Sequence, residues 1–563
     1  MDIIAEHGVK DVVCSPGSRN TPLIIAAAAR ENLRKHVIVD ERSAAFVALG
    51  MALVSRRPVA LVCTSGTALL NYAPAVAEAY YQGIPLIVIT ADRPKEWIDQ
   101  DDSQTIKQPY SLANIVKETY DISDREQCDG DGWYENRVFN DAMLTALRPK
   151  QGPVHINLRL SNPLQSTVEF NPDAPCRIIG EIHPAPVPSR DDIKRLAASL
   201  VGKKVLIVAG FMNPDSRLNK GMLRMAAHNN VCVMAETLSN LHLPAECYAI
   251  DSTLCTLDDT RRQALAPDVV ISVGGALVSR MLKTYLRRCA AENHNIIHWS
   301  VGHQHTTVDC FQNLSLRIEA DPGQFINSLS AELQHQRKIA ADLDSESEAY
   351  LYSADWSMLR LLSIRRMDSI AGEARWSDLR AFDIIMHNID PDVNLFLSNG
   401  TAVRYAQICT RILPHACYCN RGVSGIEGST STALGASLAS PHPTWIITGD
   451  TSFAHDIGAL AANVTTGSSL KIIVINNKGG GIFRFISTTS RLECREEYFC
   501  ANPALDISKV APAFGFSYLK AENPENLEEA MTRMKSESGP AILEISTPPE
   551  QSAKILRKAL NIK

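Results

Sequence analysis

The sequence has few of the features that mark secreted, zinc-binding or membrane proteins. Its 14 cysteines are scattered over 563 residues without a CxxC pair, and the closest two, Cys417 and Cys419, have CxC spacing. Such spacing indicates neither a disulfide framework nor a zinc site. The chain also has no run of about eighteen apolar residues, the length that spans a membrane, and no basic segment followed by an apolar core at its start. We therefore expect a cytoplasmic protein without a membrane span.

Charge of one sign is not concentrated anywhere. There are 56 Lys and Arg and 62 Asp and Glu, a net charge of −6, and no long run of either sign. This argues against a polybasic surface for nucleic acid or membrane lipids. At 45% hydrophobic residues the composition is that of a globular protein, and 563 residues are too many for one core.

Apolar runs alternate with helical stretches, which predicts an α/β fold of parallel sheets flanked by helices. We predict three domains, at 1–165, 190–335 and 365–563, joined by a Pro-rich linker at 165–190 and a polar, helix-prone linker at 331–357. The predicted strands are 11–14, 36–39, 59–63, 86–90 and 154–158, then 205–209, 231–235, 269–273 and 296–299, then 445–448 and 472–475. The central domain is Rossmann-like but lacks GxGxxG, so we do not expect it to bind a nucleotide.

Polar residues end two apolar runs of the third domain. Asp450 follows the run at 445–448, and Asn477 follows the run at 472–475, just before Gly479, Gly480 and Gly481. Ligands bind at the carboxyl ends of parallel strands, so we expect Asp450 and Asn477 on neighbouring loops of one sheet edge. Carboxylate, amide and carbonyl oxygens suit Mg²⁺, which takes its remaining ligands from phosphate and water.

The first and third domains repeat the same order of features. Residues 60–90 and 445–477 each give a strand, a Gly-containing turn, a helix of small residues and a second apolar strand. Each domain also closes with Gly-Pro before an apolar strand, GPVHINL at 152 and GPAILEI at 539. We interpret the pair as a duplication.

These features together resemble the thiamine-diphosphate (ThDP) enzymes, which have one domain for the pyrimidine and a related one for the diphosphate. The resemblance implies a three-domain ThDP-enzyme architecture with ThDP and Mg²⁺ (or Mn²⁺), and metal ligands Asp450, Asn477 and Gly479. It implies that Glu41, in DERSAAF, hydrogen-bonds the pyrimidine ring. The implied cofactor-binding residues are Glu41, Asn399, Thr401, Ile426, Gly449, Asp450, Thr451, Ser452 and Asn477. In this family the cofactor lies between two subunits, so a homodimer or homotetramer is implied.

Four segments resemble one branch of that family. They are SPGSRN, DERSAAFVALGMA, CTSGTALLNYAPAVAEA and IPLIVITADRP, and the branch is the SEPHCHC synthases (MenD) of menaquinone biosynthesis. That resemblance implies decarboxylation of 2-oxoglutarate and 1,4-addition of the resulting carbanion to isochorismate. Arginines pair with such carboxylates. The implied catalytic residues are Glu41, Ser18, Arg19 and Gln104, and the implied substrate-binding residues are Arg19, Arg280, Arg404, Arg421, Ile482 and Phe483.

The chain departs from the family in several places. Met281 follows Arg280 where a second cation is frequent, Gly400 replaces a frequent hydroxyl residue with Thr401 beside it, and relatives begin earlier than Asp2. Two alternatives stay open: another ThDP enzyme, such as an acetolactate synthase or a 2-oxoacid decarboxylase, and a non-catalytic scaffold of this fold. The first domain has no His-His pair, and His455, beside Asp456, is interpreted as structural because it has no partner at catalytic spacing.

Overall fold

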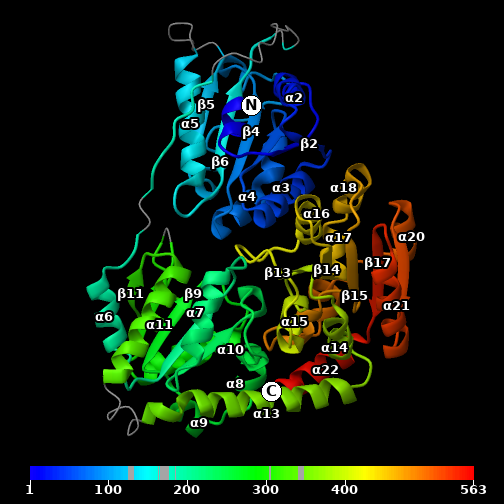
Figure 1. The fold of residues 1–563 in the computed structure, drawn as a ribbon. Helices are drawn as coiled ribbons and strands as arrows, with labels where there is room; N and C mark the ends of the chain where they lie inside the picture. Colours follow the sequence, from blue (N-terminus) through cyan, green and yellow to red (C-terminus); the bar gives the residue numbers. More distant parts are fainter. Residues whose placement is uncertain are drawn as a thin grey trace.

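Three parallel sheets, each flanked by helices, form the molecule (Figure 1). The computed structural model describes residues 1–124, 132–162, 164, 176–183, 186–303, 306–339 and 348–562. The first sheet lies at the top of Figure 1, with the central sheet at the lower left and the third at the lower right. This arrangement confirms the predicted fold class. Among the described residues, no helix has the length and apolar character needed to cross a membrane.

The first sheet has the strand order β2-β1-β3-β4-β6-β5. Its strands are β1 (Asp11–Cys14), β2 (Arg34–Val37), β3 (Val59–Cys63), β4 (Leu86–Asp92), β5 (Thr119–Ser123) and β6 (Val154–Arg159), with helices α1 (Asp2–Glu6), α2 (Thr21–Ala28), α3 (Glu41–Ser55), α4 (Ala68–Gln82) and α5 (Trp133–Leu147). The strand predicted at 36–39 lies two residues earlier, at Arg34–Val37. Asp40 caps α3 through a 3.0 Å hydrogen bond from the backbone N–H of Arg42, so the residues before it lead into the helix.

The central sheet has the order β11-β10-β9-β7-β8. Its strands are β7 (Val205–Ala209), β8 (Val231–Ala235), β9 (Val269–Val273), β10 (Ile297–Val301) and β11 (Leu314–Ile318), with α6 (Arg190–Ala198), α7 (Ser216–Ala226), α8 (Ile250–Leu254), α9 (Asp259–Ala264), α10 (Arg280–Glu292) and α11 (Pro322–Ile339). Edge strands β5 and β11 were not predicted because exposed residues interrupt their apolar pattern.

The third sheet has the order β13-β12-β14-β15-β17-β16. Its strands are β12 (Asn394–Leu397), β13 (Ala416–Tyr418), β14 (Thr444–Gly449), β15 (Lys471–Asn476), β16 (Ser517–Ala521) and β17 (Ala541–Ser546). Its helices are α13 (Tyr352–Glu373), α14 (Asp378–Asn388), α15 (Ala402–Cys409), α16 (Ser429–Ala439), α17 (Asp450–His455), α18 (Gly458–Thr466), α19 (Gly481–Phe485), α20 (Ile507–Ala513), α21 (Pro524–Ser536) and α22 (Pro549–Ala559). The first and third sheets connect their strands in the same relative order, which supports the duplication.

Helix α13 corrects the prediction of a linker at 331–357. The helix begins at Tyr352, and both Tyr352 and Trp356 are fully buried in the core behind the central sheet. Its later residues Met367 and Ala371 pack in the core shared with the third sheet. The helical tendency was predicted, but the polar composition concealed that one narrow apolar face packs in a core. The other predicted linker, at 165–190, lies largely outside the described residues.

Helices α3 and α16 join the first and third sheets. A Cβ at Gly50 of α3 would lie 2.8 Å from the carbonyl carbon of Thr432, and one at Gly435 of α16 would lie 2.7 Å from that of Val47. Both distances are too short for a carbon atom, so the two backbones cross in direct contact. Glycine permits this approach, and it fixes the position of α3, whose first residue is Glu41.

Candidate active site

Asp450 and Asn477 meet at the carboxyl edge of the third sheet. Their strands β14 and β15 are neighbours, with Gly449 opposite Ile475. Asp450 Oδ2 accepts a 2.7 Å hydrogen bond from the backbone N–H of Gly479, in the turn that contains Asn477. The structure therefore places Asp450 beside the 477–479 turn, as their positions at strand ends predict.

Two residues that the sequence analysis missed hold this turn. Asn477 Nδ2 donates to Asp378 Oδ2 at 2.9 Å, which leaves the amide oxygen of Asn477 as its donor atom for a cation. Arg484 is only 2% exposed and donates to the carbonyl oxygens of Asn477 and Gly479, both at 3.0 Å. Asp378 lies 99 residues before Asn477, so no local pattern could reveal the pair.

The residues at this edge fit a hard divalent cation. The donor atoms on Asp450, Asn477 and Gly479 are oxygens, the set that Mg²⁺ prefers. Burial raises the pKa of Asp450, and a bound cation would favour its ionised form. Gly479 has φ +91°, and a Cβ there would lie 2.9 Å from the backbone N of Asn502. A cavity of about 150 Å³, lined in part by Asp450 and Asn502, adjoins the turn and offers space for a phosphate group.

Other implied cofactor-binding residues shape the loop before α16. Asn399 Nδ2 donates to the carbonyl oxygens of Asn420 and Gly425, both at 2.7 Å. Ser452 Oγ donates to the carbonyl oxygen of Ile426 at 2.9 Å, which ties α17 to the same loop. The remaining implied residues near this edge are Thr401, at the start of α15, and Gly449 and Thr451, on either side of Asp450.

Glu41 lines a separate polar cavity of about 240 Å³ in the first domain. Gln104 lines the same cavity, as do Thr64 and Ser65. The buried hydroxyls of Thr64 and Ser65 have no hydrogen-bond partner among the described residues. Unpartnered buried hydroxyls beside a carboxylate suit a polar heterocycle, so the cavity fits the pyrimidine that the resemblance implies.

The SPGSRN loop places its two implied residues differently. Arg19 is 6% exposed, and its Nη1 donates to Leu160 O and Asn162 Oδ1, both at 3.2 Å. Burial, with Arg93 adding, lowers the pKa of Arg19. Ser18 is exposed in the turn before α2. Neither residue lines the Glu41 cavity, although Asp102, which lines it, acts on the pKa of Arg19.

Gln108 is a further residue of the first domain that the sequence analysis missed. It is fully buried, and its Oε1 accepts a 2.7 Å hydrogen bond from the backbone N–H of Gly66, which lines the Glu41 cavity. Its Nε2 donates to Asn157 Oδ1 at 2.8 Å. Gln108 therefore ties the wall of this cavity to strand β6.

A single loop brings together three of the predicted arginines. Arg280 begins α10, Arg404 Nη1 donates to Val278 O at 3.2 Å, and Arg421 Nη2 donates to Leu277 O at 3.4 Å. Burial, with Arg421 adding, lowers the pKa of Arg404. Arg280 makes no hydrogen bond or ion pair that is defined among the described residues and is exposed, so it is available to an anion.

Glu236, also missed by the sequence analysis, fixes this loop. It is fully buried and accepts hydrogen bonds from the backbone N–H groups of Val278 (2.8 Å) and Ser279 (2.7 Å). Burial raises the pKa of Glu236 to about 7. The carboxyl group therefore holds the backbone of the two residues directly before Arg280, where α10 begins.

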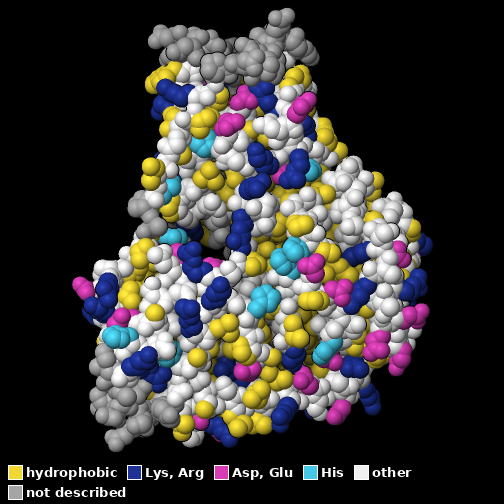
Figure 2. Space-filling model, in the orientation of Figure 1, with side chains coloured by type: hydrophobic (Ala, Val, Ile, Leu, Met, Phe, Trp, Pro, Cys, Tyr) yellow, Lys and Arg dark blue, Asp and Glu magenta, His cyan; other side chains and the backbone are white. Residues whose placement is uncertain are grey.

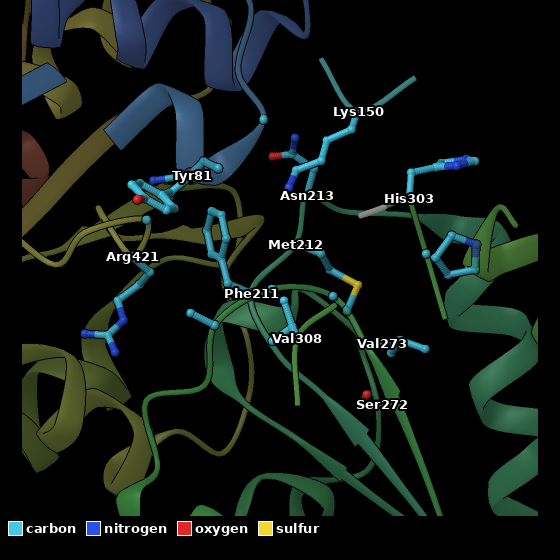
Figure 3. Close-up of a pocket in the computed structure, with 18 of the residues that line it drawn as sticks. Tyr81, Lys150, Phe211, Met212, Asn213, Ser272, Val273, His303, Val308 and Arg421 are labelled. Atoms are coloured by element: carbon cyan, nitrogen blue, oxygen red, sulfur yellow. The ribbon is translucent and has the colours of Figure 1, made fainter. Parts of the chain in front are cut away.

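The arginines face two larger cavities. Arg280 and Arg404 line one of about 470 Å³, beside Phe485. Arg421 lines another of about 730 Å³, which Figure 3 shows with Tyr81 and Lys150 of the first domain and Phe211 of the central one. Figure 2 shows a hollow between these two parts of the molecule with Lys and Arg side chains around it. No Asp or Glu is among the described residues that line the larger cavity.

Ile482 and Phe483 follow the glycine cluster on α19 and are half-buried. The Phe483 ring lies 5.8 Å from that of Phe499. His455 is exposed, and its carbonyl oxygen accepts a 2.8 Å hydrogen bond from Arg42, whereas Asp456 is buried. These contacts fit the structural interpretation of His455.

Two protein-family descriptions match the chain. Residues 1–111 match the thiamine pyrophosphate enzyme, N-terminal TPP binding domain, and residues 399–545 match the C-terminal TPP binding domain. The 2-succinyl-5-enolpyruvyl-6-hydroxy-3-cyclohexene-1-carboxylate synthase of Porphyromonas gingivalis is 37% identical, covering 99% of this chain and 95% of that protein. The protein of the same name from Flavobacterium johnsoniae is 35% identical, covering 99% and 97%. The crystal structure of benzoylformate decarboxylase from Polynucleobacter necessarius has the same fold, with a TM-score of 0.70, 16% identity and 98% of both chains covered.

Proposed function

The chain belongs to the family of 2-succinyl-5-enolpyruvyl-6-hydroxy-3-cyclohexene-1-carboxylate (SEPHCHC) synthases, and we propose that it catalyses their reaction in menaquinone biosynthesis. It is a ThDP-dependent transferase that decarboxylates 2-oxoglutarate and adds the four-carbon product to isochorismate. The observation that carries this proposal is the full-length similarity together with the three arginines gathered at the 277–280 loop.

ThDP supplies the chemistry of decarboxylation and carbon–carbon bond formation when it is bound. We assign the metal, Mg²⁺ or Mn²⁺, to the oxygens of Asp450, Asn477 and Gly479. Asp378 orients the amide of Asn477, and Arg484 holds the turn. These residues are suited to bind the cation and, through it, the diphosphate.

Glu41 has the position of a proton-holding group in the pyrimidine cavity. Its carboxylate lies at the first turn of α3, and the unpartnered hydroxyls of Thr64 and Ser65 lie beside it. We assign to Glu41 the hydrogen bond to the ring, and to Thr64 and Ser65 further contacts with it. Gln104, on the same cavity, is assigned a contact with substrate.

The arginines suit the carboxylates of the two substrates. Arg280 and Arg404 share one cavity, and Arg421 donates a hydrogen bond to Leu277 of the loop directly before Arg280. A guanidinium holds a carboxylate through two parallel hydrogen bonds, so these groups would orient the substrates. We assign the apolar wall to Ile482 and Phe483, and a further anion contact to Arg19 and Ser18.

We propose that the protein is a homo-oligomer in the cytoplasm, a dimer or a tetramer, as membership of the family implies. Among the described residues, those that line the Glu41 cavity belong to the first domain, and those that line the Asp450 cavity belong to the third. One cofactor must contact both, which is possible if a second copy completes each site.

Release of CO₂ from 2-oxoglutarate tests the proposed function. Purified protein with ThDP and Mg²⁺ is assayed with and without isochorismate, and with pyruvate in place of 2-oxoglutarate. The proposal expects fast release only with 2-oxoglutarate and isochorismate, with equal consumption of isochorismate. Release without isochorismate, or only from pyruvate, would indicate another ThDP enzyme. Tight ThDP binding without turnover would indicate a scaffold.

A further inference from the structure

Three metal-ligating side chains meet at the amino edge of the third sheet, the edge opposite Asp450. Asp392 precedes β12, His415 precedes β13 and His442 precedes β14. The sheet order β13-β12-β14 makes these three strand starts neighbours, although the residues are up to 50 positions apart. The cluster is therefore a product of the sheet topology, and it lies outside the proposed catalytic site.

The three side chains lie close together. His442 Nδ1 lies 2.8 Å from Asp392 Oδ1, and the rings of His415 and His442 stack with centroids 3.6 Å apart and planes 20° from parallel. One ligand atom from each of the three residues lies within 4.8 Å of the other two. A tetrahedral zinc site has bonds of about 2.0–2.2 Å to such atoms, and each imidazole binds a metal in the plane of its ring. The two stacked rings must therefore rotate out of their stack before both nitrogens point at one ion.

We propose that Asp392, His415 and His442 form a binding site for a divalent transition-metal ion, with Zn²⁺ as the best-fitting ion. Two imidazole nitrogens and one carboxylate oxygen suit Zn²⁺, Ni²⁺ or Cu²⁺, whereas Mg²⁺ prefers an all-oxygen set. Asp392 is exposed and the two histidines are half-buried, so the ion can enter from solvent and keep a water as its fourth ligand.

The surroundings of His415 disfavour its protonated form. Two imidazolium rings at this separation would repel, and the pKa of His415 is lowered by burial, with His442 adding. A neutral imidazole is the ligand form. Asp392 and His242 also act on His415, the carboxylate favouring and the second histidine opposing its protonated form.

The three side chains lie near a junction between the third sheet and the central domain. His242 follows η3 (Thr237–Ser239) in the central domain. Its neighbour Asn240 pairs with the backbone of Cys417 in β13, accepting from its N–H at 2.6 Å and donating to its carbonyl oxygen at 3.0 Å. The site therefore adjoins an existing junction between two domains, and a bound ion would join three neighbouring strand starts of the third sheet there.

Calorimetric titration with Zn²⁺ tests the proposal on the protein loaded with ThDP and excess Mg²⁺, which keeps the catalytic cation site saturated. All variants carry Cys494→Ser, since Cys494 is the exposed cysteine among the described residues. The test variants are His415→Gln and His442→Gln. The matched control is His387→Gln, whose histidine lies 3.5 Å from the carboxylate of Asp383 on α14.

The proposal expects one Zn²⁺ per chain and a rise in the unfolding temperature with Zn²⁺. Each test variant should bind at least about tenfold more weakly and lose that rise, whereas the control should keep both. Co²⁺ in place of Zn²⁺ should give a visible absorption band that both test variants lose. Equal Zn²⁺ binding by the parent protein and both test variants would overturn the proposal, as would binding that the control loses equally.

Discussion

The direct backbone contact between α3 and α16 predicts that Gly50→Ala destabilises the protein. Within a helix, replacing glycine by alanine ordinarily stabilises a protein by about 1 kcal/mol. Here the new methyl group would lie 2.8 Å from the carbonyl carbon of Thr432 and 3.0 Å from the backbone N of Ala436. These are backbone atoms of a packed helix, so they cannot rotate away as a side chain would.

Overpacking of this kind costs about 1–3 kcal/mol, and the contact with backbone places Gly50→Ala at the upper end. We therefore expect a net loss of about 2 kcal/mol after the gain in helix propensity. Because α3 begins with Glu41, a displaced helix should also weaken ThDP binding.

Thermal and urea unfolding measure the effect, with Gly372→Ala as the control. Gly372 lies in α13, and a Cβ there would meet no atom within 4 Å. The control should be as stable as the parent protein or more so, while Gly50→Ala unfolds at a lower temperature and urea concentration. If the two variants unfold alike, the direct backbone contact between α3 and α16 is not present in solution.

Three further outcomes follow from the site. Glu41→Gln should bind ThDP but lose turnover by about a thousandfold, and near-normal turnover would remove its proton-holding role. Arg404→Ala and Arg421→Ala should each raise KM for substrate by about 10–100-fold, Arg404→Ala without changing ThDP affinity, and unchanged kinetics in both would place the anion site elsewhere. Burial raises the pKa of Asp456 to about 7, above its unfolded value near 4, so this carboxyl stabilises the fold below about pH 4 and loses that contribution as the pH rises to about 7. Asp456→Asn can keep the hydrogen bonds to Ser431, and it should remove pH dependence on the order of 4 kcal/mol from the unfolding free energy; equal pH dependence in both proteins would contradict this.

The buried strands could be predicted because their signal is local. β1, β3, β7, β8 and β9 have the predicted bounds, since a strand covered on both faces is a continuous apolar run. The same reasoning failed at the sheet edges and at α13, where only one face is apolar. It also missed β12, an interior strand that is fully buried. Burial of Trp356 could not be predicted because it depends on the central sheet, which comes earlier in the chain.

The sequence by itself determined where the ligand-binding ends of the strands would be. Asp450 and Asn477 each follow an apolar run, and neighbouring parallel strands present such ends at one edge, so their meeting required no knowledge of distant contacts. The similarity of the first and third domains is likewise visible in the order of local features.

Only the tertiary structure decided which distant residues support and complete the site. Asp378 orients Asn477, Glu236 clamps the start of α10, and the 277–280 loop collects Arg404 and Arg421 from more than 120 residues away. The same holds for the histidine cluster, which exists because β13, β12 and β14 are adjacent. The physical reason is that a buried charge or an open coordination position is satisfied by whatever lies near it in space, and sequence separation does not encode that distance.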